Sequence, residues 1–189
     1  MNPFEYALGL LSVLIGLALG DVAMSMHKLV RHWRTVRWDG RVLLSALLVV
    51  VMLIRMWFSF WGIRSFGIVL YFPFYLSMFA ELMILFLVAA ACLPDDPAPD
   101  IDLGAFYEEN RPALWIAFAL FQTGYALHGI YFNGPDQPLR VWAGWLVPIL
   151  FFLLLAFVRT RWLHYALPLT LILWVLSEHW GRSLAAAPG

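Results

Sequence analysis

The chain has 189 residues, of which 63% are hydrophobic and only 13% are charged, and its formal net charge at pH 7 is zero. A soluble domain carries about 25% charged residues, so this composition excludes an ordinary soluble domain and predicts an all-α, polytopic membrane protein. The balanced charge gives no reason to expect a nucleic-acid partner. The lone Cys92 excludes an intrachain disulfide.

Six apolar segments approach the length of about 20 residues that a helix needs to cross about 30 Å of hydrocarbon. We expect a bundle of six transmembrane helices over residues 4–26, 42–63, 68–93, 113–132, 141–158 and 162–180. The first segment has no basic region before it and no small-residue cleavage site after it, which favours a retained helix over a signal peptide. No connecting segment is large enough to fold alone, so residues 1–189 are predicted to form a single domain.

Basic residues are distributed unequally between the two sides of this predicted bundle. One side has eight, Lys28, Arg31, Arg34, Arg37, Arg41, Arg111, Arg159 and Arg161, and the other has three, Arg64, Arg140 and Arg182. Because cytoplasmic loops are enriched in lysine and arginine, the first group is predicted to be cytoplasmic. Both termini are then predicted to lie on the outer side of the membrane, which would be the periplasmic side of an inner membrane.

The segment after the first predicted helix concentrates four of these charges, Lys28, Arg31, Arg34 and Arg37. The cluster has two interpretations. It could signal topology only, or it could bind anionic lipid, since each basic residue near an anionic leaflet contributes about 1 kcal/mol.

The first predicted helix also has small residues at intervals of four, Ser12, Gly16 and Gly20. This pattern lets helix backbones approach closely in a membrane, either within one subunit or between subunits. Six short helices leave little room for a pore inside one subunit. We therefore expect a homo-oligomer.

The segment between the third and fourth predicted helices is acidic and rich in proline. Asp96 and Asp100 lie four residues apart, and carboxylates of this kind could bind Mg²⁺ or Ca²⁺. Pro94, Pro97 and Pro99 oppose the helix that would place both on one face. We therefore interpret the segment as a solvated loop without a metal, followed by a short helix capped by Asp102.

Two charged residues, Arg55 and Glu81, interrupt the second and third predicted helices. A charge at bilayer depth costs a few kcal/mol or more, so it normally faces a partner or a water-filled cavity. We expect the two to pair, with Ser59 on the face of Arg55 and Ser77 on the face of Glu81. The pair could serve as a gate, ion site or proton relay, or it could be a structural ion pair that fixes helix register.

Three further polar residues are predicted near the outer ends of the last helices. Tyr125 and His128 lie about one turn apart on the fourth, and Glu178 lies near the end of the sixth. They could line an outer vestibule or simply pack with hydrogen-bonded partners. The histidines do not form a convincing pair of axial haem ligands, and no cofactor is predicted.

The order of several motifs is similar to that of a known group of proteins. The motifs are Phe4-Glu5-Tyr6 with Gly9, Ser12, Gly16 and Leu17, the segment from Trp57 through Trp61 to Gly62, Leu93-Pro94, and Asp102 leading to Tyr107. Over about two thirds of its length, the chain thus resembles a widespread family of bacterial six-helix membrane proteins that has no assigned activity. The resemblance implies a bacterial inner membrane and supplies no catalytic residues.

Three classes of function are compatible with these features. The first is a small channel or transporter for ions, with Arg55 and Glu81 in its pathway. The second is a non-catalytic scaffold or sensor in the bilayer. The third and weakest is a metal-dependent enzyme that uses the acidic loop, because no nucleophile-base pair is recognisable in the sequence.

Overall fold

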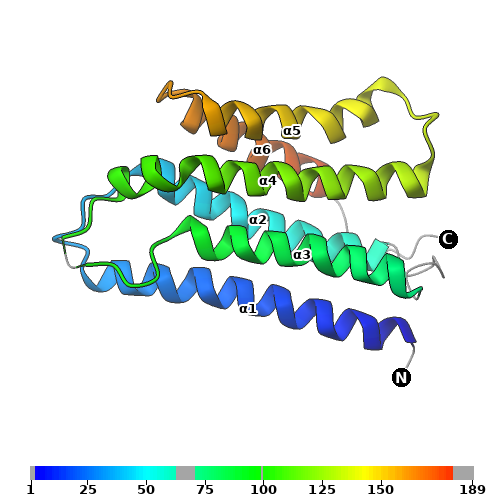
Figure 1. Ribbon diagram of the computed structural model, residues 1–189, viewed down its shortest axis with the longest axis horizontal. Coiled ribbons are helices and arrows are strands. Elements are labelled where there is room, and N and C mark those ends of the chain that lie inside the picture. Colours follow the sequence, from blue (N-terminus) through cyan, green and yellow to red (C-terminus); the bar gives the residue numbers. More distant parts are fainter. Residues whose placement is uncertain (1–2, 63–70, 99, 181–189) are drawn as a thin grey trace.

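The computed structural model describes residues 3–62, 71–98 and 100–180, and all its regular secondary structure there is α-helical. The helices are α1 (Pro3–Arg31), α2 (Gly40–Gly62), α3 (Phe72–Cys92), α4 (Leu103–Asn133), α5 (Leu139–Phe157) and α6 (Leu163–His179), as Figure 1 shows. The predicted helix residues 63 and 68–70, together with Arg64 and Arg182, lie outside the described residues.

Five of the helices, α1 to α5, are long and apolar enough to cross a membrane. The all-α class and five membrane-length helices are thereby confirmed. The sixth helix, α6, is present but has 17 residues. At 1.5 Å per residue its length is about 26 Å, somewhat below the thickness of the hydrocarbon layer.

Two helices extend beyond their predicted ends. Helix α1 continues to Arg31 instead of ending at residue 26, and α4 begins at Leu103 instead of residue 113. As predicted, Asp102 caps α4, accepting hydrogen bonds from the backbone N–H groups of Gly104 at 2.9 Å and Ala105 at 3.0 Å. The short helix predicted after Asp102 is continuous with α4, because polar residues of its first turns, such as Glu108, pair with residues of the bundle.

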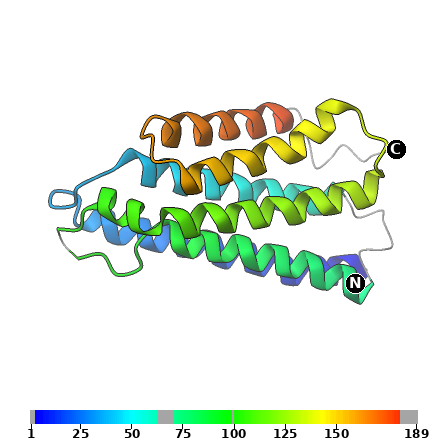
Figure 2. The ribbon, with the colours of Figure 1, turned by 45° about the horizontal axis from the view of Figure 1, so that its top comes forward.

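Helix α2 is the centre of the arrangement, because it contacts α1, α3, α4 and α6. Helix α4 lies between α3 and α5, and α6 packs against α2 and α5 (Figures 1 and 2). Successive helices run in opposite directions, so the start of α3, the end of α4 and the start of α5 meet at one end of the bundle. We call this the α3-start end. The opposite end, where α1 finishes at Arg31, is called the α1-end.

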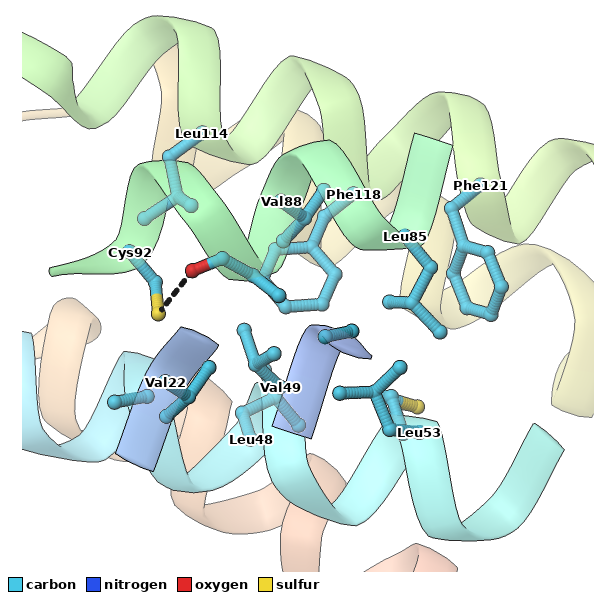
Figure 3. Close-up of a cluster of buried hydrophobic side chains, with 14 of the residues drawn as sticks. Val22, Leu48, Val49, Leu53, Leu85, Val88, Cys92, Leu114, Phe118 and Phe121 are labelled. Carbon is cyan, nitrogen blue, oxygen red and sulfur yellow. Dashed lines mark hydrogen bonds between the residues drawn. The ribbon is translucent and has the colours of Figure 1, made fainter. Parts of the chain in front are cut away.

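The core is apolar and joins all six helices, including α5 through Phe152 and α6 through Leu171. Figure 3 shows the part of it that lies between α1, α2, α3 and α4. It contains Val22 of α1, Leu48, Val49 and Leu53 of α2, Leu85, Val88 and Cys92 of α3, and Leu114, Phe118 and Phe121 of α4. The Cys92 thiol is buried and donates to the Ala89 carbonyl at 3.0 Å. Large apolar side chains are also exposed on the outer faces, including Leu139 at 83% and Phe157 at 70%, as expected for helices solvated by lipid tails.

At the α1-end, the basic and acidic loops are joined to each other. The N–H of Arg37 donates to the Ile101 carbonyl at 3.0 Å, and the N–H of Leu103 donates to the Arg37 carbonyl at 3.1 Å. Lys28 donates to the Asp96 carboxylate at 2.9 Å. The two loops therefore form one surface, in which part of the basic charge is neutralised.

A buried ionic network lies next to these loops and corrects the interpretation of two arginines. Arg41 and Arg111 were counted as loop charges of the predicted cytoplasmic side, but only 6% and 4% of their surfaces are exposed. Arg41 pairs with Asp39 at 2.8 Å and with Glu108, and Arg111 donates to the Val158 carbonyl at 2.5 Å. The hydrogen bond from Arg41 holds the pKa of Asp39 below its usual value. Burial is tolerated because each charge has a partner.

A second set of buried polar groups continues the network toward α6. The Tyr107 hydroxyl lies 2.7 Å from Nδ1 of His164 and accepts a hydrogen bond from Nε1 of Trp115 at 2.9 Å. The other ring nitrogen of His164 lies 2.9 Å from the Val158 carbonyl oxygen. These polar groups are satisfied by one another, which fixes α4 against α6 at the α1-end.

Candidate functional site

The most deeply buried carboxylate in the apolar part of the described bundle is Glu81, near the middle of α3. Only 3% of its surface is exposed. Its Oε2 lies 2.6 Å from Nδ1 of His128 on α4. A glycine lets α4 pass close to this side chain, since a Cβ on Gly124 would lie 3.4 Å from Cγ of Glu81. The buried charge therefore has a partner supplied by a neighbouring helix.

His128 also contacts a hydroxyl, so that three side chains form one hydrogen-bonded chain. Its Nε2 lies 2.9 Å from Oγ of Ser77, and Ser77 is also 2.7 Å from the carbonyl oxygen of Phe74. Ser77 and Glu81 are four residues apart on α3 and so share one face of the helix. Because both imidazole nitrogens are engaged, a proton taken up at one can be released at the other.

Arg55 does not make the predicted direct pair with Glu81, which corrects that expectation. No ion pair between them occurs within residues 3–62, 71–98 and 100–180. The Arg55 guanidinium lies over the Tyr125 ring, 4.2 Å from its centre, and Nη1 is 3.6 Å from Sδ of Met52. The side chain ends on the aromatic ring instead, so the two charges interact only at a distance.

The prediction that Ser59 and Ser77 group with the charges of Arg55 and Glu81 is confirmed only in part. The Ser59 hydroxyl donates to the backbone carbonyl of Arg55 at 2.9 Å, the usual arrangement of a serine inside a helix. Ser59 does not contact the Arg55 side-chain charge. It still lines the same cavity as Glu81.

A cavity of about 280 Å³ opens beside Glu81 and His128. Its other described polar lining residues are Ser59, Tyr125 and Asn133. Most of the remaining wall is aromatic or contains methionine, from Met56, Phe58, Phe60, Phe74, Met78, Phe132 and Trp145. The cavity is thus an apolar chamber that has one buried carboxylate in its wall.

A second cavity, of about 580 Å³, adjoins the first and has a different charge character. Arg55, Arg140 and Glu178 line it, and Glu178 accepts a hydrogen bond from Trp174 at 2.9 Å. Tyr125 and Trp145 line both cavities. These two rings form the common wall, with Arg55 on the side of the second cavity.

The position of Trp145 depends on a glycine in the facing helix. A Cβ added at Gly129 of α4 would lie 2.7 Å from Cε2 of Trp145, closer than atoms can pack. The indole, which is 8% exposed, is therefore accommodated against the bare backbone of α4. Gly129 sets the shape of the common wall.

The structure thus brings most of the predicted pathway and vestibule residues together. Glu81, Ser59, Tyr125 and His128 line the first cavity, and Arg55, Tyr125 and Glu178 line the second. Ser77 is joined to the group through His128. The residues predicted for a pathway and those predicted for a vestibule are therefore neighbours around two adjoining cavities.

The predicted lipid-facing basic residues lie far from this site in the fold, at the α1-end. Lys28 is paired with Asp96 at 2.9 Å, and Arg37 lies 3.7 Å from Asp102. Arg31 and Arg34 are exposed, and the Arg34 guanidinium lies 5.4 Å from the centre of the Trp33 ring. Arg37 is exposed as well, so the four residues differ mainly in that Lys28 and Arg37 face acidic partners.

Within the described ranges, no group of three or more His, Cys, Asp or Glu side chains is placed to hold a metal ion. Asp96, one of the two loop aspartates considered as metal ligands, is used in the contact with Lys28. The acidic loop consequently gives no geometric support for metal-dependent chemistry.

The aromatic lining of the first cavity and the place of Arg140 in the second were not predicted from the sequence. Phe58, Phe74, Phe132 and Trp145 read as ordinary apolar residues of membrane helices, since nothing in their spacing separates a cavity wall from a lipid-facing surface. Arg140 was treated as a topology charge, although it lines the second cavity. The close spacing of Gly124 and Gly129 was the available signal that α4 is approached by large side chains.

Comparison of the chain with protein-family models, with curated proteins and with solved structures gives no match. The function is therefore argued from the geometry and chemistry of this site.

Proposed function

We propose that the protein is a small proton-linked channel or transporter of the bacterial inner membrane, in which Glu81 and His128 form the proton-binding pair. The observation that carries the proposal is the 2.6 Å contact between a carboxylate that is 3% exposed and an imidazole that opens on a cavity. An ionisable group within a membrane helix is costly unless it pairs or meets water, and such groups mark ion and proton pathways.

The two cavities supply space on both sides of the proposed gate. Tyr125 and Trp145 separate the chamber of Glu81 from the chamber of Arg55, Arg140 and Glu178. In this proposal, Arg55 is a fixed counter-charge held on the Tyr125 ring. Movement of these two rings would connect the chambers, while the Glu81–His128 pair takes up and releases the proton.

The proposal includes six crossings, outside termini and assembly from several copies. Helix α6 would cross a locally thinned bilayer, because a short hydrophobic helix is accommodated by such thinning. Gly16 and Gly20 are exposed on α1, and a Cβ on either would meet nothing within 4 Å. This unused small-residue face supports contact with a second copy, since close approach of helix backbones favours association in membranes.

The test is proton and potassium flux through purified protein in liposomes under imposed gradients. We expect wild-type protein to dissipate the proton gradient and Glu81→Gln to abolish this activity while the variant stays folded. Glu109→Gln, an exposed carboxylate of α4 that lines neither cavity, is the matched control and should retain the flux. Absence of flux in the wild type would instead favour a scaffold or sensor module.

A second candidate function, acyl transfer by a serine nucleophile, is favoured by one specific observation. Ser77, His128 and Glu81 are connected in the order nucleophile, base and orienting acid, at 2.9 and 2.6 Å, which is the arrangement that activates serine in hydrolases. The Ser77 hydroxyl, which donates to the Phe74 carbonyl at 2.7 Å, would turn its proton toward Nε2 of His128 as its oxygen attacks an ester carbonyl. The imidazole would then protonate the leaving alcohol, and water would hydrolyse the acyl-serine.

This candidate is tested with a fluorophosphonate probe, which labels activated serines covalently. Labelling of the wild type that is lost in Ser77→Ala and retained in Ser59→Ala would support it. Ser59 is the control because it lines the same cavity but bonds only a backbone carbonyl. Equal labelling of all three proteins, or none, would remove the candidate without affecting the flux experiment.

A further inference from the structure

The wall of the first cavity is dominated by aromatic rings. Six of its described lining residues are aromatic: Phe58, Phe60, Phe74, Tyr125, Phe132 and Trp145. Several are in contact with each other or with His128, including Phe74 with His128 at 5.1 Å and with Phe132 at 5.1 Å between ring centres. The face of an aromatic ring is electronegative, so such a wall attracts cations.

The charged residues around the cavity also favour a cation over an anion. Glu81 is the one acidic side chain among its described lining residues, and neither lysine nor arginine is among them. The nearest arginine, Arg55, lies on the Tyr125 ring and lines the adjoining cavity. His128, the other titratable group of the wall besides Tyr125, is already engaged with Ser77 and Glu81. An anion placed here would therefore meet a carboxylate and no basic side chain of lysine or arginine.

Together these features select one class of ligand. We propose that the first cavity binds a small organic ammonium that has an apolar or aromatic body, with its charge toward Glu81 and its body against the rings of Phe74 and Tyr125. A volume of about 280 Å³ corresponds to about nine water molecules at their liquid density. An amine of the size of phenethylamine fits this space, whereas a much larger cation would need the wall to move.

The inference deepens the proposed function and rests on it for one point, that the ligand is carried across the membrane. A carboxylate that holds a proton attracts a cation less strongly than an ionised one, so proton and ammonium would compete for Glu81. Binding itself requires only the cavity, the rings and the carboxylate. Binding and transport can therefore fail separately.

The experiment is a titration of purified full-length protein in detergent, followed by isothermal calorimetry, with three ligands of similar size. These are phenethylamine, which is cationic, 2-phenylethanol, which is neutral, and 3-phenylpropionate, which is anionic. We expect phenethylamine to bind at least about tenfold more tightly than 2-phenylethanol, a difference of about 1.4 kcal/mol, and phenylpropionate not to bind. Equal affinity for the amine and the alcohol, or preference for the acid, would overturn the inference.

Variants locate the site. Glu81→Gln should weaken phenethylamine binding by about tenfold through loss of the ion contact. Phe74→Leu should weaken it by up to about tenfold through loss of the ring against which the body of the ligand packs. Phe74→Tyr keeps a ring and should bind the amine as the wild type does. Glu178→Gln changes a residue outside the first cavity and should also leave amine binding unchanged. If Glu81→Gln does not fold, the ligand series on the wild type and the Phe74 pair still decide the question. Unaltered affinity in Phe74→Leu would place the ligand elsewhere and overturn the inference.

The same titration separates this inference from the proposed function. Amine binding without flux in liposomes would retain the site and remove transport. Proton flux without amine binding would retain the proton pathway and remove the ammonium site.

Discussion

The Nδ1 atom of His128 lies 2.6 Å from Oε2 of Glu81, so the partner of the buried carboxylate is an imidazole on α4 and not the guanidinium on α2. This contact spans two helices and includes a group that can change its own charge. A Glu–Arg pair would be permanently ionic, whereas a Glu–His pair can share or exchange one proton. The contact therefore makes Glu81 and His128 a candidate site of proton transfer, in place of the expected ion pair between Glu81 and Arg55.

Removal of His128 should destabilise the protein strongly. In His128→Ala, Glu81 would lose the partner that lies 2.6 Å away, and loss of one partner of a buried pair costs about 3 kcal/mol or more. The double variant Glu81→Gln/His128→Ala should lose less than the sum of the single variants. Unfolding by denaturant in detergent micelles measures all three, and additive losses would contradict direct coupling.

Gly129→Ala should destabilise the packing of α4 on α5. The new Cβ would lie 2.7 Å from Cε2 of Trp145, and such overpacking typically costs about 1–3 kcal/mol. Gly144→Ala, on α5 itself, is the matched control, because a Cβ there would make only an ordinary contact with Trp174 at 3.7 Å, and it should be neutral or stabilising by up to about 1 kcal/mol. Thermal unfolding in micelles compares them, and equal melting temperatures would contradict the packing at Trp145.

The ion pair of Asp39 with Arg41 should make the free energy of unfolding depend on pH under acidic conditions. The pKa of Asp39 is lowered in the folded protein by the hydrogen bond from Arg41, so the folded state binds this proton less readily than the unfolded state. The contribution is therefore fully present above the ordinary value of 3.8 and is lost as the pH falls through the lower folded value. Asp39→Asn should abolish this part of the pH dependence, as measured by unfolding between neutral and strongly acidic pH.

Binding of anionic lipid should depend on the exposed basic residues of the cluster that have no acidic partner among the described residues, Arg31 and Arg34. Arg31→Ala and Arg34→Ala together should reduce the number of anionic lipids retained in native mass spectrometry, since each basic residue near such lipids contributes about 1 kcal/mol. Lys28→Ala should have a smaller effect, because Lys28 is already bonded to Asp96. Equal loss from Lys28→Ala would show that the pairing with the acidic loop does not limit lipid binding.

Much of the fold could be predicted from the sequence, because helices in a lipid environment must satisfy their backbone internally and so appear as long apolar segments. The helix ends were less predictable. The sequence predicted a short helix capped by Asp102 and a separate membrane helix from residue 113. The structure has one continuous helix from Leu103, whose Asp102 cap forms as predicted and whose Glu108 meets Arg41. These partners come from distant parts of the chain, which local composition does not reveal.

By itself, the sequence determined that the chain forms apolar helices long enough for a bilayer and that Arg55 and Glu81 interrupt two of them. Only the tertiary structure decided that Glu81 meets His128, that Arg55 rests on Tyr125, and that six aromatic residues enclose a cavity. The physical reason is that hydropathy is a property of each segment, whereas a side chain's partner depends on the relative height and rotation of two helices, which the packing of small residues such as Gly124 and Gly129 sets.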